Sequence, residues 1–136
     1  MSAEAHRSAD AIMAADLTKV AVVRDNAHVL LMDFDDLDNY NKFKSYFLPA
    51  LQKHLDVLHV STWPSKSGLP HRHVKVLLGE GLDLGMRLAL QAACGSDPER
   101  EIFNVINHTV HDDPDPSILF RPKDAKVEVL YDVELQ

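Results

Sequence analysis

The stretch that decides the fold is HVLLMDFDDLDNYNKFKSYFLPALQKHLDVLHVSTW, residues 28–63. It opens with an apolar run, His28–Phe34, that is typical of a buried strand. Apolar residues then recur every three or four positions, which predicts an amphipathic helix over residues 37–55. A second apolar run, Val57–Trp63, predicts the next strand. The sequence therefore places a helix between two strands that it can cover.

Three residues bear on the start and the middle of that helix. Asp36 or Asp38 can accept hydrogen bonds from the free N–H groups of the first turn, so either can act as the N-cap. Pro49 lacks an N–H group and lies inside the apolar stripe, so we expect it to kink the helix or divide it in two. The stripe consists of Tyr40, Phe43, Phe47, Leu51 and Leu55.

The flanking sequence adds strands on both sides and two further helices. Residues 18–23 predict a strand, and the turn residues Arg24–Ala27 predict that it pairs with residues 28–34 as a hairpin. Gly95 is expected to end one helix and Ser96 to cap the next. The remaining expected elements are a loop over Pro64–Pro70, strands over His73–Leu78, Ile118–Arg121 and Lys126–Val133, and helices over Leu84–Ala93 and Pro98–Asn107.

The resulting order, ββαββααββ, predicts an α+β fold. Paired strands with helices between them favour a two-layer sandwich, in which helices cover one face of a mainly antiparallel, RRM-like sheet. The other face would then be a working surface or would be covered by a partner protein. Residues 1–16 are expected to form an N-terminal arm or a short helix, and residues 17–136 a single domain.

Composition narrows the class of protein further. The chain has 136 residues, 46% of them hydrophobic, which suits one globular domain with its own core. Cys94 is the single cysteine, so no internal disulfide can form and a cytoplasmic location is expected. No segment approaches the ~20 apolar residues of a membrane span, and no signal peptide is expected. The net charge of -7 counts against a protein that coats nucleic acid electrostatically.

Asp33 and Asp35 are the first candidates for chemistry. They close an apolar strand, and residues two apart on a strand point to the same face, so both carboxylates emerge side by side. Adjacent carboxylates repel one another, and a divalent cation is the usual remedy. Alternatively, Asp33 simply ends the strand, and the acids at Asp35–Asp38 cap the following helix.

His71 and His73 are the second candidate pair. The same period places both imidazoles on one side of the sheet, where they suit a transition metal, or where one contacts a phosphate. Ser67 and Gly68, in the loop before them, offer backbone N–H groups that can bind phosphate oxygens. Alternatively, both histidines are satisfied by neighbouring carbonyl groups.

Three other features have simple structural interpretations. The segment HTVHDDPD, residues 108–115, contains several potential metal ligands but also many turn residues, so we interpret it as a solvated acidic loop. Trp63 can either stack a base or anchor its own loop. Cys94 lies in an apolar helix and is expected in the core.

In chain order these features resemble the catalytic core of the archaeo-eukaryotic primase superfamily, the PrimPol-type primases. LLMDFD, residues 30–35, is similar to the family's first motif, three hydrophobic residues followed by Asp–hydrophobic–Asp. SKSGLPHRHV, residues 65–74, is similar to its second motif, a Ser/Gly loop and Ser-x-His at a strand start, with His73 as the histidine and His71 in place of the serine. Residues 89–101 and 118–123 are similar to small phage-borne proteins of this layout, so the resemblance extends from Val29 to Lys123.

The resemblance implies a primase-palm-like domain that performs metal-dependent nucleotidyl transfer in DNA replication, in a bacterial host if the protein is phage-borne. Asp33 and Asp35 would hold Mg²⁺ or Mn²⁺ and would form the catalytic centre with His73. The substrates would be a nucleoside triphosphate and a single-stranded or primed nucleic acid. The residues expected to bind the nucleotide or its phosphates are Ser65, Ser67, Gly68, His71, Arg72, Lys75 and Arg121.

The sequence departs from the family at the third motif, an acid on a later strand. Phe120 and Arg121 stand at the expected place, so Asp115 or Asp132 would have to substitute. Without a third acid, the chain would be a non-catalytic version that binds a nucleotide or single-stranded DNA.

Two alternatives use the same sequence differently. GLPHRHVKVLL, residues 68–78, is similar to the His-hydrophobic-His strand of rolling-circle initiators and relaxases, whose histidines bind a metal while a helix-borne tyrosine attacks DNA. Here Arg72 replaces the hydrophobic residue, and Tyr131, the only later tyrosine, is expected on a strand. The other alternative is a non-enzymatic adaptor that binds a protein on its exposed sheet face or edge.

Overall fold

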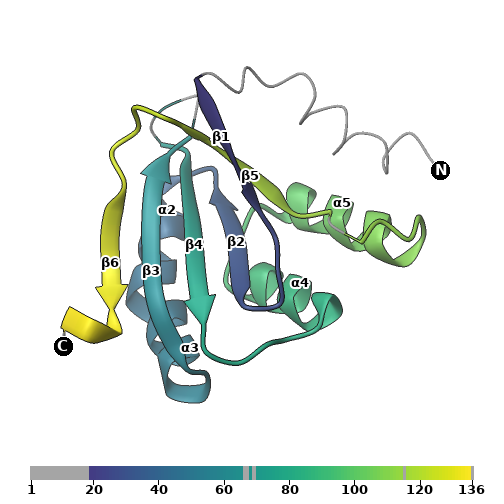
Figure 1. The fold of residues 1–136 in the computed structure, drawn as a ribbon, viewed down its shortest axis with the longest axis horizontal. Helices are drawn as coiled ribbons and strands as arrows, with labels where there is room; N and C mark the ends of the chain where they lie inside the picture. The colour runs from purple at the N-terminus through teal and green to yellow at the C-terminus, as the bar shows by residue number, and fades with distance from the viewer. Residues whose placement is uncertain (1–18, 66–67, 69, 115, 136) are drawn as a thin grey trace.

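A computed structural model describes residues 19–65, 68, 70–114 and 116–135, and the expected arm at residues 1–16 lies outside the described residues. The fold is α+β, as predicted, and contains a four-stranded antiparallel sheet in the order β2-β4-β3-β6 and a two-stranded antiparallel ribbon, β1–β5 (Figure 1). The elements are β1 (Val20–Arg24), β2 (Val29–Phe34), α2 (Leu37–Lys42), the π-helical turn η1 (Phe43–Phe47), α3 (Leu48–His54), β3 (Val57–Pro64), β4 (Arg72–Leu78), α4 (Leu84–Ala93), α5 (Pro98–Thr109), β5 (Ile118–Pro122), β6 (Glu128–Asp132) and the 3-10 turn η2 (Val133–Leu135).

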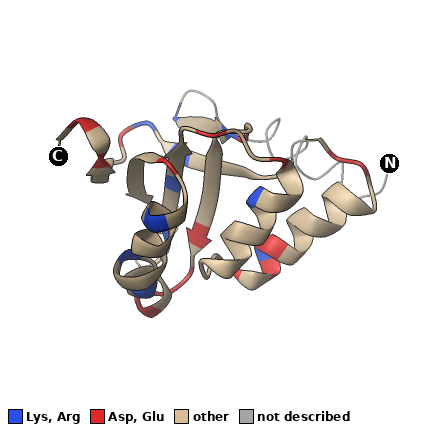
Figure 2. Ribbon diagram, turned by 90° about the horizontal axis from the view of Figure 1, so that it is seen from below, with Lys and Arg blue, Asp and Glu red and all other residues tan. Residues whose placement is uncertain are grey.

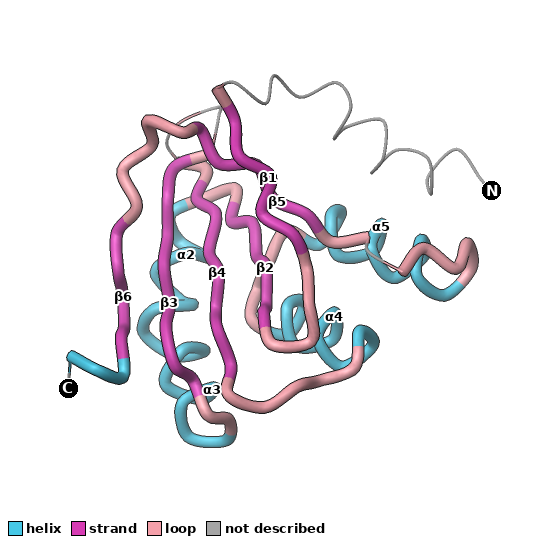
Figure 3. The backbone as a smooth tube through the Cα atoms, in the orientation of Figure 1, coloured by secondary structure: helices cyan, strands magenta, loops and turns pink. Residues whose placement is uncertain are grey.

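One face of the four-stranded sheet carries the main core. Leu30, Met32 and Phe34 alternate along β2 onto this face and pack against Phe43 and Leu51 from the helical segment. Figure 3 shows α2 and α3 running behind the sheet on this side. We call this face of the four-stranded sheet, which carries the main core, the helical face. The predicted arrangement, helices on one face of an antiparallel sheet, is confirmed for α2, α3 and α4.

The helix predicted over residues 37–55 is continuous but changes its winding. Asp36 Oδ1 accepts from the N–H of Asn39 at 2.7 Å, so Asp36 is the N-cap. Ahead of Pro49 the chain forms a π-helical turn, in which the N–H of Leu48 bonds to the oxygen of Phe43. Pro49 is the second residue of α3 and directly follows this turn, so the change of winding falls where the missing N–H of proline interrupts the α-helical hydrogen bonds. The expected division therefore occurs as a local change of helix type.

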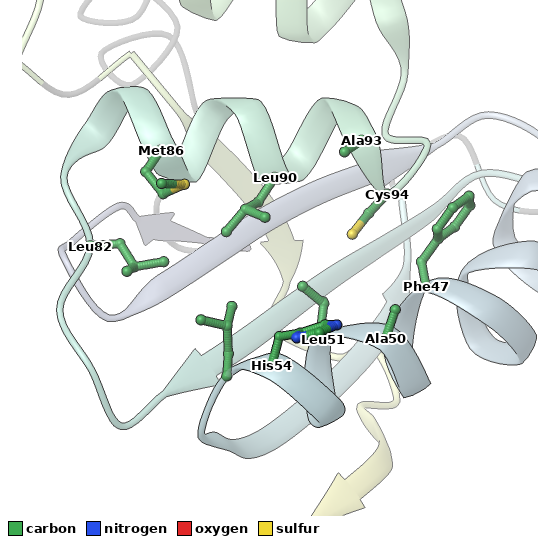
Figure 4. A pocket seen from close by; sticks show the side chains of 10 residues that line it. Phe47, Ala50, Leu51, His54, Leu82, Met86, Leu90, Ala93 and Cys94 are labelled. Atoms are coloured by element: carbon green, nitrogen blue, oxygen red, sulfur yellow. The ribbon is translucent and has the colours of Figure 1, made fainter.

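A shallow apolar groove of about 310 Å³ remains between α3 and α4 (Figure 4). Phe47, Leu51, Met86 and Leu90 line it, and Cys94 lies at its floor with 4% exposure. Burial raises the pKa of the Cys94 thiol to about 11, so it stays protonated and behaves as a small apolar residue. The prediction that Cys94 belongs to the core is confirmed.

The opposite face of the sheet is covered in part by the β1–β5 ribbon, and we call it the ribbon face (Figure 1). Val29 and Leu31 of β2 pack there against Trp63 of β3 and Leu119 of β5. The predicted hairpin between residues 18–23 and 28–34 is wrong, because β1 pairs with β5 instead. The face that the sequence left for a protein partner is thus partly used by the chain itself.

The outer edge of β2, where β1 was expected, is occupied by α4 and α5. Leu31 donates its N–H to Gln91 Oε1 at 3.1 Å and accepts from Arg100 at 3.0 Å. Asp33 donates its N–H to Ser96 Oγ at 3.0 Å. These side chains satisfy the backbone groups that a neighbouring strand would otherwise bind. Ser96 therefore caps the edge of β2, and the prediction that it caps α5 is wrong: the N-cap is Asp97.

The two remaining predictions for this region agree with the structure. Gly95 ends α4 with a φ of +87°, a left-handed conformation that glycine adopts without strain. Pro98 occupies the first turn of α5.

Among the helices described, none is long and apolar enough to cross a membrane.

Candidate functional site

Two pairs of side chains meet where β2 ends and β4 begins. The antiparallel register places Asp33 opposite His73, and two residues further on Asp35 reaches His71. Asp33 Oδ1 lies 3.4 Å from His73 Nε2, and Asp35 Oδ1 lies 3.2 Å from His71 Nδ1. The Asp-x-Asp and His-x-His segments, which the sequence placed on separate strands, therefore form one site on the ribbon face.

The backbone of Asp33 explains why its side chain comes so close to His73. Its N–H bonds to Ser96 Oγ, and its oxygen accepts from the N–H of Asp97 at 2.7 Å. Since both groups point away from β4, Asp33 and His73 form a non-hydrogen-bonded pair, in which cross-strand side chains approach most closely.

A third carboxylate joins the site from the start of α5. Asp97 precedes this helix, and its bond to Asp33 holds it against the end of β2. One oxygen from each of Asp33, Asp35 and Asp97 lies within 4.8 Å of the other two. Asp97 is not among the residues predicted for the site, because Ser-Asp-Pro at residues 96–98 was interpreted only as the start of a helix. Only the docking of α5 on the edge of β2 reveals its second role.

Asp115 and Asp132 were expected to replace the missing third acid, but among the described residues neither lies at this site. Asp132 pairs with His59 at 3.3 Å on β6, at the opposite end of the sheet from β2. Asp115 lies outside the described residues. The third acid therefore comes from a helix, because the edge of β2 is covered by helices rather than by a strand.

His73 has its proton on the ring nitrogen that faces away from Asp33. Nδ1 lies 3.0 Å from the backbone oxygen of Phe120, and since a carbonyl oxygen only accepts, Nδ1 must donate. Burial lowers the pKa of His73 to about 4, so the ring is neutral at pH 7 and Nε2 carries a lone pair. Two acceptors, Nε2 and Asp33 Oδ1, thus face each other, which is favourable only when a proton or a cation lies beside them.

Asp33 is the carboxylate that a neighbouring proton or cation would stabilise most. Its Oδ1 is buried and has no hydrogen-bond partner. Burial raises the pKa of Asp33 to about 6; the positive charge of Arg100 opposes the shift, and the carboxylates of Asp35 and Asp97 add to it. Burial and Asp35 also raise the pKa of Asp97. The ionised carboxylates are therefore unfavourable in this site, and a proton or a cation beside them would stabilise them.

The donor set fits a hard divalent cation. Three carboxylate oxygens converge, and one imidazole nitrogen lies beside them. Carboxylate oxygens are the ligands preferred by Mg²⁺ and Mn²⁺, and a bare imidazole nitrogen is acceptable to Mn²⁺. The buried, unpartnered Oδ1 of Asp33 is the atom that a cation would satisfy most directly.

The loop before β4 closes on itself. Gly68 donates its N–H to the oxygen of Ser65 at 2.9 Å, and His71 donates its N–H to the oxygen of Gly68 at 3.0 Å. Gly68 takes a φ of +77°, which suits this turn. The backbone donor of Gly68 that was expected to bind phosphate is therefore used inside the turn, and Ser67 lies outside the described residues.

The basic residues expected along a phosphate path are divided between the two faces. Lys75 follows His73 by two residues and so shares the ribbon face. Arg72 points to the helical face, where its guanidinium lies 5.5 Å from the Tyr40 ring and 3.5 Å from Glu128. Arg72 is thus separated by the sheet from the carboxylates, which follows from strand alternation.

Trp63 and Arg121 link the sheet to the ribbon. Trp63 is 1% exposed, and its Nε1 donates to the oxygen of Phe120 at 3.1 Å. The guanidinium of Arg121 lies 5.9 Å from the centre of the Trp63 ring. Of the two roles considered for Trp63, anchoring is the one that this burial allows.

The acidic segment at residues 108–115 forms no further cluster of metal ligands within the described residues. His108 and Thr109 end α5, and residues 110–114 belong to no helix or strand. The predicted loop is therefore found over residues 110–114, whereas His108 and Thr109 belong to the helix.

Comparisons of the chain with models of known protein families, with curated proteins and with solved structures found no match. The function therefore rests on the geometry of the carboxylate site.

The opposed shifts of Asp33 and His73 predict a pH signature in the metal-free protein. Asp33 titrates at about 6 when folded and near 3.8 when unfolded, so its stabilising effect is lost as pH rises through 6. His73 titrates at about 4 when folded and near 6.5 when unfolded, so its stabilising effect is lost as pH falls through 4. Between pH 4 and 6 the two groups change the free energy of unfolding in opposite directions, and their effects largely cancel.

Replacing one of the two residues should reveal how the other changes the free energy of unfolding with pH. Relative to wild type, Asp33→Asn should gain stability as pH rises from 4 to 6, and His73→Gln should lose it, each on the order of 2–3 kcal/mol. Urea unfolding in EDTA at several pH values measures both differences. Two flat difference profiles would show that the pair does not titrate in this range.

Proposed function

We propose that the protein binds Mg²⁺ or Mn²⁺ at Asp33, Asp35 and Asp97 and uses the ion for nucleotidyl transfer on a nucleoside triphosphate and a nucleic-acid end. The observation that carries the proposal is the convergence of three carboxylates around a buried oxygen without a hydrogen-bond partner. Such a site is costly without a cation and gains strongly from one. A divalent ion held there supplies charge stabilisation for transferring phosphoryl groups.

The residues around the carboxylates have separate tasks in this proposal. His73 is held in one tautomer by Phe120, so its neutral Nε2 can coordinate the ion or accept a proton beside Asp33. His71 contacts Asp35 through Nδ1 and fixes the orientation of that carboxylate. Asp97 completes the ligand set that the chain would otherwise lack.

Positive charge for the phosphates comes from the ribbon face. Lys75 lies along β4 from His73, and Arg121 extends from β5 over Trp63. Two cations beside an acidic site suit one triphosphate better than a long nucleic-acid duplex, which needs many phosphate contacts. The net charge of -7 is consistent with this limited contact.

The tyrosine-dependent alternative has less support. Tyr131 packs against the core of the helical face, whereas His71 and His73 lie on the ribbon face. A nucleophile on the far side of the sheet cannot reach DNA bound at the histidines. The adaptor alternative does not explain the convergence of the carboxylates.

A primer-extension assay tests the proposal. We expect wild type to extend a labelled primer on a single-stranded template with Mn²⁺ or Mg²⁺ and not in EDTA. Asp97→Asn removes one ligand and should lower the rate at least tenfold. Glu99→Gln, an exposed acid in the same first turn of α5, is the matched control and should retain the rate.

Two results would contradict nucleotidyl transfer. Nicking of circular single-stranded DNA without extension would assign the site to strand cleavage. If wild type neither extends the primer nor nicks DNA, and Asp97→Asn binds Mn²⁺ as tightly as wild type does, the proposed metal site is wrong as well.

A further inference from the structure

Helix α5 has the reverse of the usual polarity. Its buried residues are the polar side chains of Glu101, Asn104 and Asn107. Its outward residues are apolar and well exposed: Ile102 59%, Val105 44%, Ile106 41% and Val110 67%. A surface helix of a globular domain normally turns its apolar stripe inward, so the outward stripe calls for a separate explanation.

The inward polar face already has a role in the fold. Glu101 accepts from Gln91 at 2.9 Å, from Asn104 at 3.2 Å and from Arg100 at 2.7 Å. Gln91 and Arg100 in turn bind the backbone of Leu31 at the edge of β2. α5 is therefore held to the domain by hydrogen bonds from Gln91 to Glu101 and from Arg100 to Leu31, and its apolar face is not used for this attachment.

The apolar residues of α5 form one wall of a groove. This groove of about 440 Å³ runs between α5 and the end of α4, and Ala92, Pro98, Ile102, Val105 and Ile106 provide its apolar lining. The outward positions 102, 105, 106 and 110 follow the three- and four-residue spacing by which one helix packs against another. The shape and the spacing suit a second helix laid alongside α5.

Acidic residues surround this apolar surface. Glu99 lies in the first turn of α5, and Asp112 and Asp113 follow its last turn. Beside Asn39, which borders the groove, are Asp36 and Asp38. In Figure 2 the ribbon of α5 is tan along its middle, with acidic residues near both ends.

The cations near the groove are engaged with acids. Lys42 pairs with Asp38 at 3.6 Å, and Arg100 pairs with Glu101. Each of these two ion pairs is neutral overall, so the negative charge of the rim comes from Glu99, Asp36 and Asp112. A second copy of this chain would bring the same acids against it, and a nucleic acid would bring phosphates, so both are disfavoured.

We propose that the outward face of α5, with the groove beside α4, docks a basic amphipathic helix of a partner protein. Apolar side chains of that helix, spaced three and four residues apart, would fill the groove beside Val105 and Ile106. Lysine or arginine residues flanking its apolar stripe would meet the acids at the two ends of α5. The groove borders the carboxylate site, since Ser96 and Pro98 flank Asp97, but Asp33, Asp35 and Asp97 do not line it. The docking proposal does not depend on the proposed nucleotidyl transfer.

A model helical peptide of leucine and lysine, with leucines spaced at i, i+3, i+4 and i+7 along one face, is a direct probe. We expect the labelled peptide to bind wild type, with an affinity that falls as salt rises, in fluorescence anisotropy. Ile106→Ser and Val110→Ser, both at exposed positions, should each weaken binding about tenfold, the loss expected for one buried apolar contact. Val129→Ser changes a comparably exposed valine on β6, at 48%, and should bind as wild type does.

Three outcomes would overturn the proposal. Equal peptide affinity in Ile106→Ser, Val110→Ser and Val129→Ser would show that the α5 face is not the site. Equal binding of the peptide with glutamate in place of lysine would remove the charge argument. Self-association of wild type that is lost in Ile106→Ser would assign the face to a second copy. Asp33→Asn should bind the peptide as wild type does, which separates this test from that of the metal site.

Discussion

Asp33→Asn should abolish the stabilisation that Mn²⁺ gives to the wild-type protein. At a free Mn²⁺ concentration of 100 times Kd, one site stabilises the folded state by about 2.7 kcal/mol, which corresponds to roughly 10 °C in Tm for a domain of this size. The variant loses the buried Oδ1 charge around which the other carboxylates gather, so we expect its affinity to fall at least 100-fold. Thermal unfolding with and without Mn²⁺ at pH 7.5 measures the shift.

The same substitution should have the opposite effect on the metal-free protein. At pH 7.5 Asp33 is ionised in a site that favours its protonated form, since its pKa is raised to about 6. Replacing it with a neutral amide removes that unfavourable charge, so the variant in EDTA should unfold at a higher temperature than wild type. A substitution that merely damaged the fold would lower Tm in both conditions, and so the two signs together identify a cation site.

Asp38→Asn is the matched control for this experiment. Asp38 is an exposed acid on α2 that pairs with Lys42, outside the carboxylate cluster. It should leave the Mn²⁺ shift unchanged. If Mn²⁺ raises the Tm of Asp33→Asn as much as that of wild type, the ion binds elsewhere and the proposed site is wrong.

Arg87→Met should destabilise the protein by about 3–5 kcal/mol, the usual effect of removing one partner from a buried ion pair. Arg87 binds the carboxylate of Asp25 in the loop between β1 and β2, and the two side chains are only 9% and 3% exposed. Its Nε also donates to the oxygen of Leu82 at 3.0 Å. Methionine keeps the apolar volume but leaves the Asp25 carboxylate buried without this cation.

A double variant distinguishes the loss of charge pairing from the loss of packing. Adding Asp25→Asn to Arg87→Met removes the buried charge, so the double variant should recover part of the lost stability in urea unfolding. Lys53→Met, an exposed position on α3, should change stability by less than about 0.5 kcal/mol. If the double variant is less stable than Arg87→Met alone, packing rather than charge accounts for the effect.

Most of the individual elements could be predicted from the sequence, because local patterns decide them. The apolar spacing of residues 40–55 predicted the helical segment, and Asp36 and Gly95 fall where they can satisfy the ends of helices. Alternation along β2 and β4 placed Asp33 with Asp35, and His71 with His73, each pair on one face. These patterns act over a few residues, so they do not depend on the rest of the chain.

The errors arose where segments distant in sequence compete for the same backbone groups. The turn residues at Arg24–Ala27 predicted a hairpin, but Gln91, Ser96 and Arg100 bind the outer edge of β2, and β1 pairs with β5. No local pattern reveals that helices will occupy a strand edge. Ser96 was expected to cap α5 because its role at the edge of β2 depends on this long-range contact with Asp33.

By itself, the sequence determined the α+β class, the order of the elements and the two candidate pairs of aspartates and histidines. The tertiary structure decided that these pairs face each other, that Asp97 supplies a third carboxylate, and that Arg72 lies on the opposite face. Strand alternation is a property of one strand, whereas register and edge coverage depend on which strands and helices meet. The carboxylate site therefore exists only once α5 has docked on the edge of β2.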